Sequence, residues 1–266
     1  MKDKTKELGK FAFELCGAEN YDAAFSAFDQ LLTSVGFDSV LYSHIPSIVL
    51  SGTSASQPVF STSESYDNRY MMQYMEAGFY KNDHMINSIN DGRMSHIDWW
   101  KDAETKQISK GAMEVFSVAR DDFKMTNGFT IPTLTGSQGI AATSFISSDS
   151  REPFDQLLQE NEQLMIACSK IFHNHVMNQA YFFGKFLEPS LPKLNPTQRA
   201  VFKGLLLGLT TPVIAEQIFR SPRYVENVVR DLRVKIGGSD ANGKPLMSKD
   251  SLIHYGGLMR FLDQLS

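Results

Sequence analysis

Apolar side chains recur at helical spacing near the start of the chain. Two sets follow one another at intervals of three and four residues: Leu8, Phe11 and Leu15, then Phe25, Phe28 and Leu32. These intervals place the members of each set on one face of a helix. The pattern therefore predicts two amphipathic helices, each with one apolar face to bury.

Strand-like segments are shorter. Val-Leu-Tyr at 40–42 forms one, and residues 128–132 and 139–146 form two more, separated by Gly136. This last pair predicts a hairpin or adjacent strands. The segment 45–65 is rich in Ser, Gly and Pro, which predicts a long loop. A short strand near Ile48–Leu50 within this loop is left open.

A long helical pattern runs from Pro153 to Phe183. Pro153 suits a first helical turn, and one face carries Leu157, Leu164, Cys168 and Ile171. A shorter aromatic and methionine-rich stretch with helical spacing spans residues 65–78. Helices around short strands predict an α/β fold for this part, an α/β/α sandwich with a central antiparallel sheet.

The segment 184–193, GKFLEPSLPK, contains one glycine and two prolines, so it is predicted to be a linker. It divides the chain into a first domain at residues 1–183 and a second domain at residues 194–266.

The second domain carries three short helical patterns, at residues 196–207, 211–219 and 222–235. Ser221 and Pro222 suit the cap and the first position of the third helix. Three short helices with tight turns predict an all-α helix-turn-helix domain. The segment 238–248 that follows reads as a flexible insert before a last helix.

Composition narrows the class of protein. The chain has 266 residues, 42% of them hydrophobic and 21% charged, which are globular values. No apolar run approaches the ~18 residues of a membrane span, and the basic start lacks the apolar core of a signal peptide. Cys16 and Cys168 lie far apart without a CxxC pair, which predicts two buried, reduced thiols. We therefore expect a cytoplasmic protein without a membrane partner, and exclude secreted disulfide-linked or metal-ribbon proteins.

Charge is distributed unevenly. The net charge is −4, yet residues 191–239 hold eight basic side chains against three acidic ones. A basic block behind an acidic body is typical of a sensor joined to a module that binds a polyanion. Charge alone leaves this open, because many surface helices are basic by chance.

The basic block resembles the DNA-binding domain of LuxR-type regulators, whose pattern runs without a gap along residues 194–239. The matching positions are Leu194, Pro196, Arg199, Val201, Gly208, Thr210, Ile214, Ala215, Ser221, Val225, Lys235 and Gly237. The resemblance implies that the third helix enters the major groove of double-stranded DNA. It assigns base contacts to Glu226, Asn227 and Arg230, and phosphate contacts to Thr210, Arg223, Tyr224 and Lys235. The alternative for Glu226 is an exposed ion pair with Arg230. Gln198, Leu209 and Val228 depart from the pattern.

The upstream part resembles the domain of quorum-sensing LuxR proteins that binds acyl-homoserine lactones. The residues that carry this resemblance are Tyr66, Tyr70, Tyr74, Phe79, Asp83 and Trp99, followed by GFTIP and GIAATS. It implies that Asp83 accepts the ligand amide N–H, Tyr66 and Ser144 donate to the amide carbonyl, and Trp99 and Thr130 line the headgroup. Tyr74 then packs along the acyl chain, with Met71, Met72 and Met75 as the tail channel.

Two positions depart from the family. Tyr70 stands where the family has a tryptophan that donates to the lactone carbonyl, and His84 replaces a proline. These changes argue against a standard lactone as the ligand, but they leave the prediction of a small-molecule pocket in place. Taken without the resemblance, the three tyrosines are plain core aromatics, and Asp83 is a helix cap.

Other signals carry no chemistry. Gly238–Lys244 matches the start of a phosphate-binding loop, but Pro245 stands where Ser or Thr is needed. His173 and His175 point to nearly opposite sides of a helix, so they cannot share a metal there. We find no catalytic constellation, and expect no enzyme, metal or cofactor beyond the small-molecule signal.

The sequence therefore predicts a ligand-responsive transcriptional regulator. One helix-turn-helix reads half of a palindromic site, which predicts a homodimer with its interface on 153–183 or 252–265. RNA polymerase is a further expected partner. Two alternatives stay open: a LuxR-type regulator with a non-lactone ligand or none, and a protein-sequestering module with a degenerate helix-turn-helix.

Overall fold

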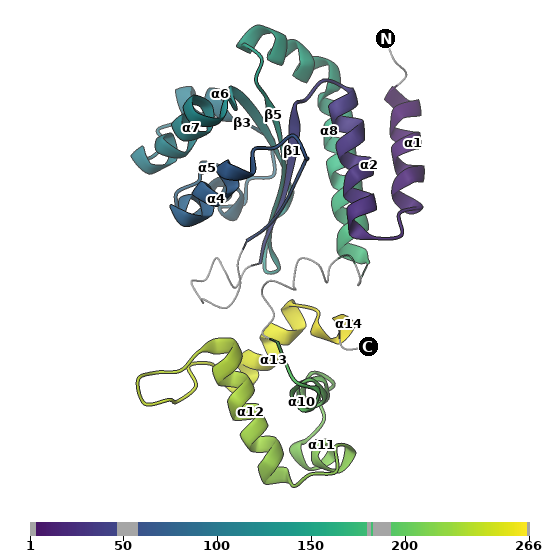
Figure 1. Cartoon of the computed structure of the whole chain (residues 1–266), viewed down its shortest axis with the longest axis vertical. Helices are drawn as coiled ribbons and strands as arrows, with labels where there is room; N and C mark the ends of the chain where they lie inside the picture. The colour runs from purple at the N-terminus through teal and green to yellow at the C-terminus, as the bar shows by residue number, and fades with distance from the viewer. Residues whose placement is uncertain (1–3, 47–57, 180–181, 183–192, 265–266) are drawn as a thin grey trace. The chain divides into compact units, whose positions relative to one another are not determined.

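The structure, a computed structural model, describes residues 4–46, 58–179, 182 and 193–264. The chain divides into two compact units (Figure 1), the first holding the described residues up to Asn178 and the second those from Gln179 onward. Residues 184–192 of the predicted linker and the optional strand at Ile48–Leu50 lie outside the described residues, so both stay predictions.

The first unit is built on a five-stranded antiparallel sheet. Its strands lie in the order β2-β1-β5-β4-β3 and comprise β1 (Ser39–Pro46), β2 (Val59–Thr62), β3 (Ile97–Asp98), β4 (Asn127–Leu134) and β5 (Gly139–Ser147). β4 and β5 form the predicted hairpin, with Asn127 opposite Ser147. The prediction of a central antiparallel sheet is confirmed.

Helices cover both faces of the sheet (Figure 1). One side, here called the packed face, carries α1 (Lys4–Cys16), α2 (Tyr21–Ser34) and α8 (Arg151–Asn178). The other side, the cavity face, carries α4 (Asn68–Glu76), the 3-10 turn η1 (Phe79–Lys81), α5 (His84–Asn90), α6 (Trp99–Thr105) and α7 (Lys110–Phe123). This is the α/β/α sandwich that the pattern predicts.

The packed face is filled by stacked aromatic rings. The rings of Phe28 on α2 and Phe172 on α8 are parallel, with centroids 4.6 Å apart. Tyr42 of β1 meets Phe172 edge-on at 5.1 Å, and its hydroxyl lies 2.8 Å from Nδ1 of His173. All three rings are fully buried, so this layer is a conventional hydrophobic core.

Several boundaries differ from those predicted. α8 begins at Arg151 and ends at Asn178, before the predicted end at Phe183. Tyr66 precedes α4 because Asp67 caps that helix, its carboxylate accepting from the Arg69 amide. The strand β2 falls inside the segment predicted as a loop, where its four half-buried residues give no clear alternation.

The prediction that both thiols are buried is wrong for Cys16. Cys168 lies in the core, but Cys16 is exposed. The buried stripe of α1 consists of Phe11 and Leu15, and Cys16 follows Leu15 by 100° around the helix, outside that stripe.

The second unit consists largely of helices. They are α10 (Pro196–Leu206), α11 (Thr211–Gln217), α12 (Pro222–Gly237), α13 (Lys249–Leu258) and α14 (Phe261–Gln264). Ser221 caps α12 by accepting from the Tyr224 amide, as its sequence predicts. The segment 238–248 contains a β-bridge between Ser239 and Pro245, and Arg233 of α12 donates to the Met247 carbonyl.

Among the helices in the described ranges, none has the length and apolar character that crossing a membrane requires. In the same part of the chain, no group of His, Cys, Asp or Glu side chains is arranged to hold a metal ion.

Candidate functional site

A cavity lies between the sheet and the helices of the cavity face. All seven residues that the resemblance assigns to a ligand line it: Tyr66, Tyr70, Tyr74, Asp83, Trp99, Thr130 and Ser144. They come from the turn before α4, from α4, from the start of α5, from the first residue of α6, and from β4 and β5. Residues up to 78 positions apart in sequence are therefore brought to one site. Ligand binding by these residues stays a prediction.

Asp83 holds two structural bonds at once. Its Oδ1 caps α5 by accepting from the amides of Met85 and Ile86, at 2.7 and 3.4 Å. Its Oδ2 accepts from the Tyr74 hydroxyl at 2.7 Å. Burial raises the pKa of Asp83, although these hydrogen bonds oppose the shift. The helix-cap alternative is thus correct for one oxygen, while the other faces the cavity group Tyr74.

Three tyrosine rings form one side of the cavity. The centroids of Tyr66 and Tyr70 lie 6.2 Å apart, and those of Tyr70 and Tyr74 lie 5.8 Å apart. Within the described part of the chain, the hydroxyls of Tyr66 and Tyr70 make no hydrogen bond. Burial raises the pKa of both phenols above the usual value. They therefore stay protonated near neutral pH and are able to donate to a ligand.

A polar chain runs along the opposite wall. The Trp99 indole N–H donates to Thr130 Oγ1 at 2.8 Å, and Thr130 Oγ1 lies 2.8 Å from Ser144 Oγ. The two hydroxyls own two protons, and their mutual bond uses one. Since the indole only donates, one proton is left for another acceptor. That proton supports the predicted donor role of Ser144.

The position of Trp99 depends on a glycine in β4. A Cβ atom on Gly128 would lie 2.2 Å from the indole, so the ring packs directly on the backbone there. This close approach sets how deeply the indole reaches toward Thr130.

The cavity is small and mostly apolar. Its volume is about 50 Å³, which is room for only a few water molecules. A ligand with an acyl tail therefore needs side chains to move. Sequence reasoning missed most of the apolar wall, which includes Leu41, Ile45, Phe60, Met85, Ile89 and Ile140. Alternation along β1 and the helical spacing of 85 and 89 were the available signals.

The predicted tail channel is only partly correct. Met75 does not line the cavity. Met71 does, whereas Met72 is 58% exposed and does not. Met71 and Met72 are adjacent on α4, and successive helical residues point about 100° apart, so one turns outward when the other turns inward.

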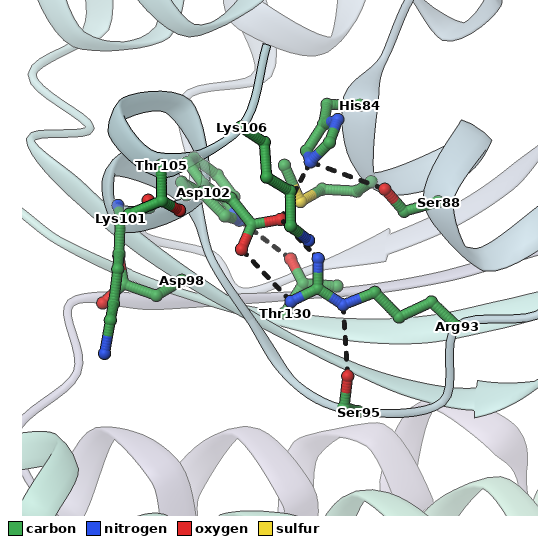
Figure 2. Close-up of polar contacts among 12 residues, drawn as sticks. His84, Ser88, Arg93, Ser95, Asp98, Lys101, Asp102, Thr105, Lys106 and Thr130 are labelled. Atoms are coloured by element: carbon green, nitrogen blue, oxygen red, sulfur yellow. Dashed lines mark hydrogen bonds and ion pairs between the residues drawn. The ribbon is translucent and has the colours of Figure 1, made fainter. Parts of the chain in front are cut away.

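Behind α5 and α6, outside the cavity, charged side chains gather around Asp102 (Figure 2). Its carboxylate lies 2.9 Å from Nε2 of His84 and 2.8 Å from Nζ of Lys106, and it pairs with the guanidinium of Arg93. Burial works to raise the pKa of Asp102, but the hydrogen bonds from Arg93, Lys106 and His84 prevail and hold it well below the usual range.

The residues assigned to DNA lie on the surface of the second unit. Arg223, Tyr224, Glu226, Asn227 and Arg230 are exposed on α12, and Thr210 is exposed before α11. The opposite side of α12 is buried through Val225, Val228, Val229, Leu232 and Ile236. One face of the helix is thus free for a partner.

Three of these side chains have contacts within the unit, and that of Tyr224 is with the Arg220 guanidinium, 5.8 Å from the centre of its ring. Lys235 Nζ donates to the carbonyl of Lys193, which occupies a group assigned to phosphate. Arg230 lies 4.0 Å from its neighbour Asp231, and no ion pair with Glu226 is found between these two described residues.

Several proteins of known structure have a fold similar to that of this chain. The crystal structure of Escherichia coli SdiA is similar over 98% of this chain and 99% of its own length, with a TM-score of 0.57 and 14% identity. SdiA in complex with octanoyl-rac-glycerol gives a TM-score of 0.55 and 15% identity, covering 97% of this chain and 96% of SdiA.

A third solved structure is CepR2 of Burkholderia cenocepacia, named as an N-acylhomoserine-lactone-dependent LuxR family transcription factor. It covers 65% of this chain and 95% of its own, with a TM-score of 0.52 and 14% identity. At such identities these likenesses show the fold. No curated protein matches the sequence.

The family model described as the autoinducer binding domain matches residues 20–176, more than half of the chain. These residues contain the sheet, the helices of both faces apart from α1 and the last two residues of α8, and the whole cavity. The chain therefore belongs to the autoinducer-binding domain family of LuxR-type regulators.

Proposed function

We propose that this protein is a cytoplasmic, ligand-responsive transcriptional regulator that binds a small signal molecule in the cavity of its first unit. The signal is an acyl-homoserine lactone in quorum sensing. The observation that supports this most is the convergence of all seven assigned residues on one cavity. They combine donors, an acceptor and apolar walls, which is what an amide-linked headgroup with an acyl tail requires.

The hydrogen-bonding groups suit an N-acylated headgroup. Tyr66, Tyr70 and the Thr130–Ser144 pair offer protons to carbonyl oxygens. Asp83 Oδ2 accepts the amide N–H in exchange for the proton of Tyr74, so binding releases the Tyr74 side chain. Movement of that ring also widens the small cavity, since Tyr74 lines it.

The second unit supplies the output. Arg230 and Asn227 on the free face of α12 suit guanine and adenine edges, and Arg223 suits a phosphate. A homodimer places two such helices on a palindromic site, and RNA polymerase is the further partner through which transcription changes.

A titration of the full chain tests the ligand. Emission of Trp99 in the Trp100→Phe variant is followed while N-acyl homoserine lactones of different chain length are added. A saturable change in Trp99 emission that disappears when Asp83→Ala is added to the Trp100→Phe variant supports the proposal. An unchanged signal with every lactone removes the lactone as ligand.

A second candidate is a regulator whose ligand is not a lactone, and the tyrosine at position 70 favours it. Tyr70→Trp separates the two. For a lactone ligand, the added indole donor preserves or improves affinity. For another ligand, the bulkier ring weakens the native response, measured with host extract in a promoter reporter.

DNA shift assays with the full chain test the output. Arg230→Ala is expected to weaken binding to a specific DNA site by ~1–3 kcal/mol and to relax the base preference at one position of that site. Arg223→Ala is expected to weaken binding to DNA of every sequence and to make the affinity depend less on salt concentration. If both leave binding unchanged at moderate salt, α12 is not the DNA-binding helix, and the sequestering alternative gains.

A further inference from the structure

One nearly buried carboxylate joins three separate segments on the outer side of α5 and α6 (Figure 2). The Asp102 side chain is 9% exposed and bonds to His84, Arg93 and Lys106. The Arg93 guanidinium reaches both carboxylate oxygens, and it also donates to Ser95 Oγ and to the His96 carbonyl. Asp102 and Arg93 are thus held by several hydrogen bonds and ion pairs to other groups of the protein.

The three partners mark the ends of the two helices. His84 is the first residue of α5, and Arg93 follows the last residue of α5 by three positions. Asp102 lies in the middle of α6, and Lys106 directly follows the last residue of that helix. A single side chain on α6 therefore holds both ends of α5.

The two helices supply most of the helical wall of the cavity. α5 and its cap contribute Asp83, Met85, Ile86 and Ile89, and α6 contributes Trp99. His84, Arg93, Asp102 and Lys106 do not line the cavity. His84 directly follows Asp83, and Asp102 lies three residues after Trp99, which is one helical turn. The contact from His84 to Asp102 therefore lies directly behind the pair of residues that face a ligand from the two helices.

We propose that His84 and Asp102 are positioning residues of the signal cavity, which fix the Asp83 carboxylate on α5 relative to the Trp99 indole on α6. This inference rests on the proposed function, because Asp83 and Trp99 are there the groups that meet the ligand. His84 and Asp102 act through their chain neighbours and touch no ligand themselves.

Short helices need such a contact. α5 and α6 have seven residues each, and helices of that length are not stable without tertiary bonds. Each carries ligand-facing residues near its first turn, where fraying is largest. A contact that holds the two together keeps the cavity ready for a ligand and reduces the ordering cost of binding.

The structure offers a matched control for the proposed pair. His96 also pairs with a carboxylate, Glu162 Oε1 on α8, at 3.0 Å. That pair joins a loop to α8 and connects neither α5 nor α6 to the other. Loss of the His96 imidazole therefore removes the same chemistry without touching the proposed contact.

The test compares His84→Ala, His84→Gln, Asp102→Asn and His96→Ala in the full chain, each in the Trp100→Phe background. Amide hydrogen exchange is measured over residues 83–90 and 99–105, together with Trp99 emission, before any ligand is added. Affinity is then measured for N-octanoyl homoserine lactone and for octanoylglycerol.

His84→Ala and Asp102→Asn are expected to speed exchange in both segments by about tenfold and to shift Trp99 emission. Affinity for a probe that binds the reference protein is expected to fall about tenfold. His84→Gln keeps a donor for Asp102, so it is expected to recover most of both losses. His96→Ala is expected to match the reference. If Asp102→Asn does not fold, the two His84 variants decide.

The proposal is overturned if exchange and emission in His84→Ala match the reference, or if His96→Ala changes them as much. It is also overturned if affinity falls equally in His84→Gln and His84→Ala. If the reference protein binds neither probe, the proposed function fails for those ligands. The exchange and emission results then still decide whether the pair positions the two helices.

Discussion

The two faces of the sheet are built from the same strands but differ in what fills them. β1 contributes to both, because successive side chains of a strand point to opposite sides. Tyr42 points to the packed face, where it meets Phe172 and His173. Leu41, Ser43 and Ile45 point to the cavity face. One strand therefore supports a closed core on one side and the wall of the cavity on the other.

The difference lies in how space and polarity are used. The packed face closes with parallel and edge-on rings, and one bond joins its buried Tyr42 hydroxyl to His173. The cavity face keeps two phenol hydroxyls without a partner among the described residues, and a volume of about 50 Å³. Under the proposed function, stability is concentrated on the first face and ligand specificity on the second. Substitutions on the two faces should therefore separate into those that unfold the unit and those that only weaken binding.

The largest effect is expected from Phe172→Ala on the packed face. It removes a fully buried ring from the stack with Phe28 and should lower the free energy of unfolding by ~3–5 kcal/mol. Urea unfolding followed by tryptophan emission measures this, since both tryptophans lie in the first unit. Phe172→Leu, which refills part of the space, is the control and should cost less. A loss below 1 kcal/mol for the alanine variant, on the order of a surface change, would contradict the comparison.

Acid is expected to weaken the packed face next. Burial lowers the pKa of His173 from 6.5 to about 4 and that of His44 to about 3. Below pH 6.5 these two imidazoles therefore bind protons in the unfolded chain but stay neutral in the folded one. The stabilisation is therefore complete above pH 6.5 and is lost as pH falls toward about 4. His173→Gln keeps an acceptor for Tyr42 and should reduce the loss between pH 7 and 4.5 by about 2 kcal/mol.

Phe172→Leu carries no proton and serves as the control for this pH effect. Its destabilisation should be equal at both pH values. An identical acid dependence in His173→Gln and wild type would show that this imidazole does not govern the response.

A smaller effect on stability, with a large one on binding, is expected from Asp83→Ala on the cavity face. The change removes the cap of α5 and the acceptor of Tyr74, so unfolding should become easier by ~1–3 kcal/mol. Ligand response in a reporter should disappear. Asp83→Asn keeps an oxygen for the cap and should retain stability while weakening the response. Equal responses in both variants would mean that the carboxylate does not contact the ligand.

The smallest effect on stability is expected from Ser144→Ala. Thr130 keeps the bond from the Trp99 indole, so the free energy of unfolding should change by less than ~1.5 kcal/mol. Affinity for a carbonyl-containing ligand should nevertheless fall. Calorimetric titration and urea unfolding of the same preparation give both values. Unfolding that changes more than binding would place Ser144 in the core and not in the site.

The sequence could predict those parts of the fold that local chemistry determines. Ser221 and Pro222 mark the start of α12 because a hydroxyl cap and a proline suit only the first turn. Residues 139–146 indicate β5 through their β-branched and small side chains. β2 was missed because it is four residues long and half-buried, so neither length nor alternation marks it.

The site shows the same limit. The spacing of Tyr66, Tyr70, Tyr74 and Asp83 pointed to residues that line the cavity only through a family resemblance, since aromatic spacing alone also fits a core. The contact of His84 with Asp102 joins positions 18 residues apart on different helices. No periodicity carries such a contact, because it depends on how two short helices pack against each other.

The close packing of Trp99 on Gly128 has a consequence for how this pocket can change over generations. With the indole in place, a Cβ atom at 128 would come within 2.2 Å of the ring, so every other amino acid is disfavoured there. A smaller side chain at 99 must be acquired before position 128 can vary, and the reverse order is blocked. Divergence toward new signals along this wall is therefore expected to begin at residue 99 and to leave the glycine for a later step.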